Sequence, residues 1–279
     1  MKKIIAVLDG LKYSASTVEY AIFIAKQEKT HLVGVFLEDM SYRSYALSEL
    51  VDKSGVSDQR IREYIEHDKQ LRSKSVKQFE QACQLAGLNY SIHKDKDTAM
   101  EALLHESIYA DLLIINANET FSHVTESKPS HFMRHLMADV SCPMLLVPSK
   151  FHHINKSALL YDGTPSSVYA IRMYDYILPA FKNLPTEVIS VKSLAASMHL
   201  PDGKLMKEFM KRHYPDATYT VLKGIPNEEI ITYLKKENRN SIIVLGAYHR
   251  SGLSRWIYPS MADNLLIGLK SPLFIAHSK

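Results

Sequence analysis

The segment from Gly246 to Arg255 combines glycine, arginine and hydroxyl side chains in a pattern that suits an anion. It reads Gly-Ala-Tyr-His-Arg-Ser-Gly-Leu-Ser-Arg and lies between a short apolar run and an expected helix. Glycine lets the backbone approach a phosphate closely, and the amides at a helix N-terminus favour negative charge. Arg250 and Arg255 add positive charge there. The segment predicts an anion-binding loop; an ordinary polar connection is the alternative.

A second chemical feature occurs twice: an apolar run that ends in Asp-Gly. Asp9-Gly10 follows residues 3–8, and Asp162-Gly163-Thr164 follows residues 156–161. An apolar run of this length that ends in Asp-Gly predicts a buried strand entering a turn. In both places a segment with helical spacing of apolar residues follows.

The two halves of the chain also end alike. Residues 111–115 match 241–245, and a proline, Pro143 or Pro272, precedes each last apolar run. Further strands are expected at 31–37, 89–94, 185–191 and 217–222, and helices near 59–86, 98–106, 130–140, 203–213, 226–236 and 255–268. Strands that alternate with helices predict two tandem α/β domains, residues 1–148 and 156–279, each with an open, doubly wound, parallel five-stranded sheet.

In such a sheet a ligand binds beyond the carboxyl ends of the strands, where the strand order reverses. In the second domain this crevice collects Asp162 to Thr164, the residues after Val191 and the loop after Leu245. The sequence therefore predicts one composite site there.

The first domain departs from this pattern in two ways. Its loop after Ile115 reads Asn-Ala-Asn-Glu-Thr-Phe-Ser, without glycine, and Glu119 would repel a phosphate. It also carries extra residues near 40–86, which could form a lid or a surface excursion packed by its own apolar side chains. We expect this domain to be structural, or to bind something other than a nucleoside triphosphate.

Composition excludes several classes of protein. Among 279 residues the net charge is +4, without an arginine-rich run, so nucleic acid is not an expected partner. Cys83 and Cys142 are expected to be buried thiols, and no apolar segment is long enough for a membrane span. A cytoplasmic, soluble protein is expected.

His131 and His135 share a helix face, but no third ligand is evident, so no metal site is expected.

These features resemble the universal stress protein family over both halves of the chain. ATP-binding members carry Gly, two residues, Gly, nine residues, then Gly followed by Ser or Thr. Mapped onto this pattern, Gly246 matches the first glycine, His249 and Pro259 replace the other two, and Ser260 matches the hydroxyl position. The resemblance implies an adenine nucleotide alpha hydrolase-like, Rossmann-like fold and ATP or another adenine nucleotide as ligand, with Mg²⁺ only if ATP binds.

This mapping, which also places Asp162 after the first strand and Val191 near the adenine, is combined with the crevice and loop residues named above to give the predicted contacts. They are Asp162, Gly163, Thr164, Val191 near the adenine, Gly246, His249, Arg250, Gly252 and Ser260. Because two glycines are replaced, weak binding or a preference for fewer phosphates is expected.

The function that this implies is a stress-response regulatory protein, more a binding module than a catalyst. The resemblance also implies an internal pseudo-dimer of the two domains, packed through their last strands, and allows a homodimer. Two alternatives stay open: a slow ATPase or nucleotide-dependent switch, and an interaction scaffold that binds no nucleotide.

Overall fold

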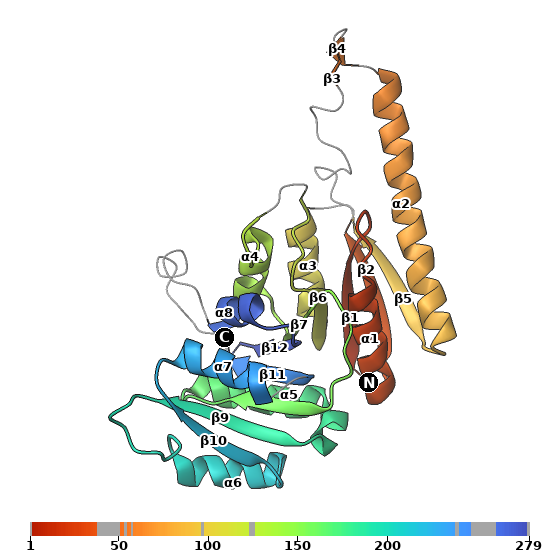
Figure 1. Cartoon of the computed structure of the whole chain (residues 1–279). Coiled ribbons are helices and arrows are strands. Elements are labelled where there is room, and N and C mark those ends of the chain that lie inside the picture. Colours follow the sequence, from red (N-terminus) through yellow and green to blue (C-terminus); the bar gives the residue numbers. More distant parts are fainter. Residues whose placement is uncertain are drawn as a thin grey trace. The chain divides into compact units, whose positions relative to one another are not determined.

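The computed structural model describes residues 2–37, 51–52, 55–56, 58–95, 98–122, 126–237, 240–246 and 261–277. The chain divides into two compact units, Met1–Ser141 and Cys142–Lys279. Figure 1 shows that each unit is built from strands interleaved with helices.

The first unit contains a parallel sheet whose described strands run in the order β6-β1-β2-β5. The strands are β1 (Lys3–Asp9), β2 (His31–Leu37), β5 (Tyr90–Asp95) and β6 (Leu112–Asn116), and a short antiparallel pair is formed by β3 (Val51–Asp52) and β4 (Gly55–Val56). The helices are α1 (Ala15–Glu28), α2 (Asp58–Leu85), α3 (Ala99–Ile108) and α4 (His131–Asp139). The strand order reverses at β1, which pairs with β2 on one side and β6 on the other.

The second unit repeats this plan with the order β10-β9-β8-β11-β12, again parallel. Its strands are β8 (Lys156–Leu160), β9 (Thr186–Lys192), β10 (Thr218–Lys223), β11 (Ser241–Gly246) and β12 (Leu273–Ala276). Its helices are α5 (Pro165–Ile177), α6 (Gly203–His213), α7 (Pro226–Glu237) and α8 (Met261–Gly268), with a 3₁₀ helix η2 (Pro179–Asn183). Here the order reverses at β8, which lies between β9 and β11.

The last strand of the first sequence repeat, β7 (Met144–Val147), belongs to the second compact unit. It pairs antiparallel with β12, so that Leu146 lies opposite Leu273 and Met144 opposite Ile275. The last strands of the two repeats are therefore hydrogen-bonded to each other. A pseudo-dimer of whole domains stays a prediction.

Local sequence explains where the first helix of each unit begins. Ser14 caps α1 by accepting a hydrogen bond from the amide of Thr17, and Thr164 caps α5 through the amide of Ser167. Such caps satisfy amides that have no partner within the helix. Pro165 occupies the first turn of α5, where no amide hydrogen is needed.

The sheets form the cores. Apolar side chains of the central strands are fully buried on both faces, as a parallel sheet covered by helices requires. Helix α1 packs beside α2, and α3 packs beside α4. Because the crossovers reverse direction at β1 and are right-handed, the two helix pairs cover opposite faces. The expected α/β class with doubly wound parallel sheets is confirmed.

Candidate functional site

A cavity of about 360 Å³ opens at the carboxyl ends of β8, β9 and β11 in the second unit. This is the point where the strand order reverses, as the sequence predicted for a crevice. Four of the predicted site residues line it: Asp162, Thr164, Val191 and Gly246. The structure therefore brings together the three strand ends that were expected to meet.

The turn after β8 is ordered by the Asp162 side chain. Its Oδ1 accepts hydrogen bonds from the amide of Thr164 at 2.9 Å and from the Thr164 hydroxyl at 2.7 Å. Gly163 between them has φ +88°, a conformation that favours glycine, and a Cβ there would lie 2.6 Å from Pro201. The Asp-Gly-Thr sequence thus stabilises this turn, and the turn places Asp162 at the cavity.

Gly246, the last residue of β11, lies against the first turn of α5. A Cβ at this position would be 2.5 Å from both the carbonyl carbon and the carbonyl oxygen of Ser166. Backbone atoms at that distance cannot give way as a flexible side chain could. Glycine is therefore required here so that α5 can pack closely on β11. This requirement does not depend on whether a phosphate binds.

The walls of the cavity are mainly apolar. Ile189 and Val191 of β9 contribute, as does Tyr161, whose hydroxyl donates to the carbonyl of Pro201 at 3.0 Å. Burial, followed by the negative charges of Asp202 and Asp162, raises the pKa of Tyr161, so the hydroxyl stays protonated as a donor. Apolar walls with a few fixed polar groups are the usual construction of a small-molecule site.

Several lining residues were not singled out from the sequence. They are Leu160, Tyr161, Pro165, Ser166, Ser167, Ile189, Pro226, Ile230, Leu245 and Met261. The even spacing of Ile189 and Val191 along a strand could have placed both on the cavity side. The contributions of α7 and α8 carry no such signal, because they depend on how helices pack over the sheet.

The anion-binding half of the predicted site lies outside the described residues. This concerns His249, Arg250, Gly252, Arg255, Pro259 and Ser260. Among the described lining residues Asp162 is the one with a charged side chain. The described part of the cavity therefore suits an uncharged ring and its hydroxyl groups better than a phosphate chain.

The equivalent crevice of the first unit is occupied by its own chain. Helix α2 crosses the carboxyl ends of β1 and β2: the Ser75 hydroxyl donates to the carbonyl of Gly10 at 2.7 Å, and Arg72 Nη1 donates to the carbonyl of Leu37 at 3.4 Å. A Cβ on Gly10 would lie 3.1 Å from Arg72 Cγ. The part of the extra region that is described, α2, thus covers these strand ends; residues 40–50, 53–54 and 57 lie outside the described part.

Two carboxylates lie near each other in the first crevice. Asp9 is buried and its Oδ1 accepts from the amide of Leu11 at 2.8 Å; Glu119 Oε1 accepts from the amides of Thr120 and Phe121. Burial, and next the negative charge of Asp9, raise the pKa of Glu119 to about 7. Near pH 7 this crevice therefore carries negative charge from Asp9 and in part from Glu119, which disfavours a phosphate.

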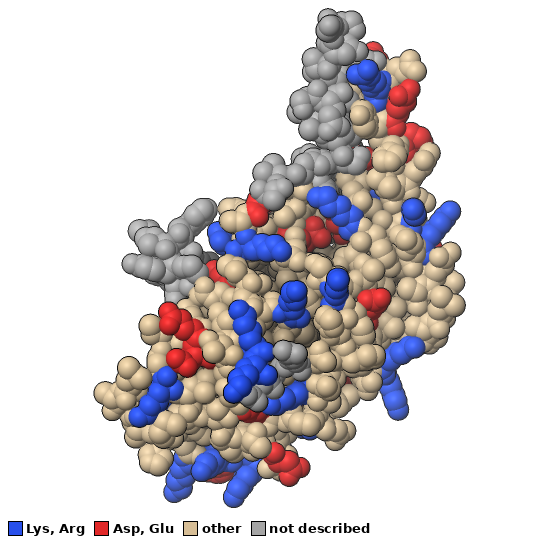
Figure 2. Space-filling view, in the orientation of Figure 1, with Lys and Arg blue, Asp and Glu red and all other residues tan. Residues whose placement is uncertain are grey.

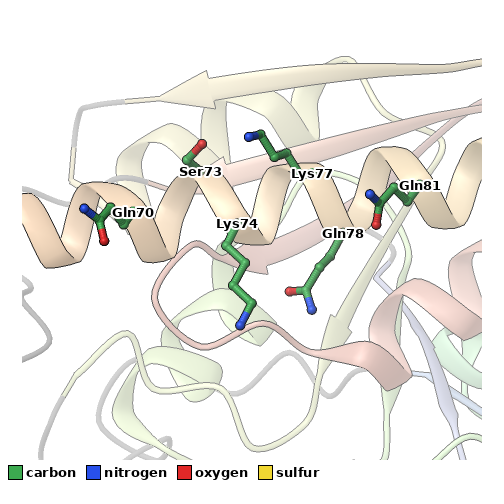
Figure 3. A pocket seen from close by; sticks show the side chains of 6 residues that line it. All are labelled: Gln70, Ser73, Lys74, Lys77, Gln78 and Gln81. Carbon is green, nitrogen blue, oxygen red and sulfur yellow. The ribbon is translucent and has the colours of Figure 1, made fainter.

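A second hollow of about 540 Å³ runs along the exposed side of α2. Its lining side chains are Gln70, Ser73, Lys74, Lys77, Gln78 and Gln81. Figure 3 shows Ser73 and Lys77 projecting to one side of the helix and Lys74 and Gln78 to the other. Side chains that diverge in this way do not converge on a ligand, so the hollow is a poor candidate for a small-molecule site.

The structure also bears on the expectations about surface charge, membrane spans, cysteines and the histidine pair. On the face drawn in Figure 2, Lys and Arg side chains are interspersed with Asp and Glu side chains. Within the described ranges, no helix combines the length and the apolar character that crossing a membrane requires. Cys83 and Cys142 are both buried, as expected. His135 contacts Asp139 at 3.1 Å, a partner one helical turn away.

No protein-family model matches the sequence, and no curated protein is similar to it in sequence. Solved structures are similar over nearly the whole chain. A universal stress protein from Archaeoglobus fulgidus has a TM-score of 0.69 at 13% identity, covering 99% of this chain and 98% of that one.

Two proteins from Pseudomonas aeruginosa are comparably similar. A putative universal stress protein has a TM-score of 0.64 at 14% identity and covers 99% of this chain and 93% of its own. A functionally unknown protein has a TM-score of 0.63 at 13% identity, with 99% and 92% covered. The resemblance read from the sequence is thus confirmed at the level of fold: from end to end, the chain has the fold of universal stress protein structures of two-domain length.

Proposed function

We propose that this chain is a regulatory protein of universal stress protein type, and that the crevice of its second unit binds an adenine nucleotide. The observation that carries the proposal is the cavity of about 360 Å³ at the strand-order reversal, lined by Asp162, Thr164, Val191 and Gly246. A cavity of this size lies within the range of small-molecule sites.

The chemistry of the described walls supports the base and ribose part of such a ligand. Apolar side chains of β9 and α7, among them Val191 and Ile230, would pack on a purine ring. The Asp162 carboxylate is an acceptor suited to ribose hydroxyl groups, and the N-terminus of α5 adds polar groups through Thr164 and Ser166. Because Asp162 also opposes negative charge, we expect AMP or ADP to bind at least as well as ATP.

The test is calorimetric titration of ATP, ADP and AMP into wild type and Val191→Trp. Val191 is partly exposed at the cavity wall, so a large side chain would fill the cavity while the core stays intact. Binding should be lost, with an unchanged far-UV circular dichroism spectrum. The control is Asp9→Asn in the first unit, at the position that corresponds to Asp162; this variant should bind as wild type does.

Two results would oppose the proposal. Wild-type protein that binds none of the three nucleotides would favour the scaffold hypothesis. Binding that survives Val191→Trp but is lost in Asp9→Asn would place the ligand in the first unit. Asp162→Asn tests whether the Asp162 carboxylate contacts the ligand. The amide oxygen of this variant can keep the hydrogen bonds from Thr164 while the charge is removed, so weaker binding would show that the carboxylate contributes to ligand binding.

A further inference from the structure

The second unit contains another cavity, of about 520 Å³, at the amino ends of β9 and β10. It lies between two connections, the one from η2 to β9 and the one from α6 to β10. The nucleotide crevice proposed above is at the opposite, carboxyl ends of these strands. The residues that line this second cavity include Lys182, His213 and Asp216.

Two of these side chains are held by one buried carboxylate, Asp175 of α5. Asp175 Oδ2 lies 2.6 Å from His213 Nδ1, and Oδ1 lies 2.7 Å from Lys182 Nζ. Asp175 is 3% exposed, whereas the Lys182 side chain is 41% exposed. The buried acid thus positions a cation and an imidazole at the wall of the cavity.

The fold itself does not require this arrangement. Counted from the N-cap residues Ser14 and Thr164, the position of Asp175 in α5 corresponds to Ala25 in α1, which is fully buried. Burying an ion pair costs desolvation energy and is often neutral or unfavourable compared with an apolar residue. In the first unit the methyl group of Ala25 fills the corresponding buried position. Packing alone therefore does not explain the charged cluster of the second unit.

The geometry of His213 leaves one ring atom for a ligand. Nδ1 is engaged by Asp175, and the ring packs on Phe209 with centroids 4.1 Å apart. Nε2 makes no hydrogen bond to any described residue. Because His213 lines the cavity and a carboxylate holds its Nδ1, Nε2 is the ring nitrogen left for recognition of a ligand.

The charges around His213 decide which ligand fits. Asp175 and Lys182 offset each other, Arg172 of α5 contributes a positive charge, and Asp216 contributes a negative charge at the rim. Burial, followed by the charges of Lys182 and Arg172, lowers the pKa of His213, so the ring is neutral near pH 7. A bound anion beside the ring would reverse this preference and favour the protonated form.

We propose that this cavity binds a small oxyanion, a carboxylate or a phosphate-type group, between Lys182 Nζ and His213 Nε2, and that His213 takes up a proton when the anion binds. Lys182 supplies a fixed positive charge and His213 becomes a charged donor. Since binding takes up a proton, affinity rises as pH falls, by up to about tenfold per pH unit above the histidine's titration midpoint in the ligand-free protein.

The test uses sulfate, whose charge is constant between pH 6 and pH 8, at constant ionic strength set with chloride. The His213 ring resonance, assigned by its loss in His213→Gln, is followed by nuclear magnetic resonance over this range. Sulfate should raise the titration midpoint of His213 and should bind more tightly at pH 6 than at pH 8. Lys182→Met should weaken binding about tenfold or more. Lys207→Met, which removes an exposed lysine of α6, should leave it unchanged.

The proposal fails if sulfate leaves the His213 midpoint unchanged at the highest soluble concentration. It also fails if Lys182→Met and Lys207→Met bind sulfate equally. His213→Gln should keep the circular dichroism spectrum of wild type and lose the pH dependence of binding; pH dependence that persists in this variant would assign the proton to another group. None of these outcomes depends on whether the other crevice binds a nucleotide.

Discussion

The two units place the same elements around the same strand ends, but a long helix crosses those of the first unit, whereas a cavity of about 360 Å³ opens at those of the second. In the second unit the helix that follows β9 is α6, with 11 residues; its counterpart in the first unit, α2, has 28. The longer helix reaches over β1 and β2, where Ser75 and Arg72 bond to the carbonyls of Gly10 and Leu37. The two units therefore differ in the length of one connecting helix, which in the first unit covers the strand ends that face the cavity in the second.

A single residue pair shows the same contrast at atomic scale. Gly246 ends β11 and Asn116 ends β6, at corresponding registers to the first strands. Gly246 lets the backbone of Ser166 approach closely, whereas Asn116 Nδ2 donates to the hydroxyls of Ser14 and Ser16 at 3.2 and 3.3 Å. In the first unit a side chain fills the space that the second unit closes by direct contact of helix and strand. The comparison yields three substitutions with graded effects.

The largest expected effect comes from Gly246→Val. Its Cβ would meet the Ser166 backbone at 2.5 Å, so helix α5 must move and the second unit should lose about 3 kcal/mol or more. Urea unfolding measures the loss. The matched change in the first unit, Asn116→Ala, removes three side-chain hydrogen bonds: the two that Nδ2 donates and the one that Oδ1 accepts from the amide of Asn118. It should cost about 1–2 kcal/mol, because these bonds are partly exposed to solvent. Equal losses would contradict the close-packing account of Gly246. Because the fold is damaged, lost nucleotide binding by Gly246→Val would not by itself report a phosphate contact.

The next effect depends on pH and concerns Glu119. The pKa of this carboxyl is raised from 4.5 to about 7, so the folded state binds a proton more tightly than the unfolded state. The stability this contributes is present below about pH 4.5 and is lost as pH rises through 7. The stability of wild type relative to Glu119→Gln should therefore fall by about 2 kcal/mol across this interval. A difference that stays constant with pH would contradict the raised pKa of Glu119.

The smallest effect tests the contact of α2 with the first crevice. Ser75→Ala removes the buried hydrogen bond to the carbonyl of Gly10 and should cost about 1 kcal/mol. The control is Ser73→Ala, which removes an exposed hydroxyl from the same helix and should change stability by less than about 0.5 kcal/mol. If both variants unfold at the same urea concentration, α2 does not hold down these strand ends.

Much of the fold could be predicted because its signals are local. The strand 31–37 and the helix 203–213 were predicted with the bounds that the structure shows, since apolar periodicity and turn residues mark their ends. The 3₁₀ helix η2 and the pair β3–β4 were not foreseen. Both are too short for a periodic pattern to form.

The candidate site was predictable only in part. Asp162, Thr164, Val191 and Gly246 follow from the rule that ligands bind at carboxyl ends of parallel strands, and the structure brings them together. The reason for Gly246 could not be read from the sequence, because it depends on how closely α5 approaches β11. The filling of the first crevice by Arg72 likewise depends on the course of a long helix in space.

Hydrogen exchange with and without AMP tests most directly the central claim, that the crevice of the second unit is the nucleotide site. Amides near a bound ligand exchange more slowly, because local opening then requires its release. The account predicts protection in peptides that contain Leu160–Ser167 and Ile189–Val191, while peptides that contain Gly10–Ser16 and Asn116–Ser122 stay unchanged. Protection confined to the first-unit peptides would contradict it.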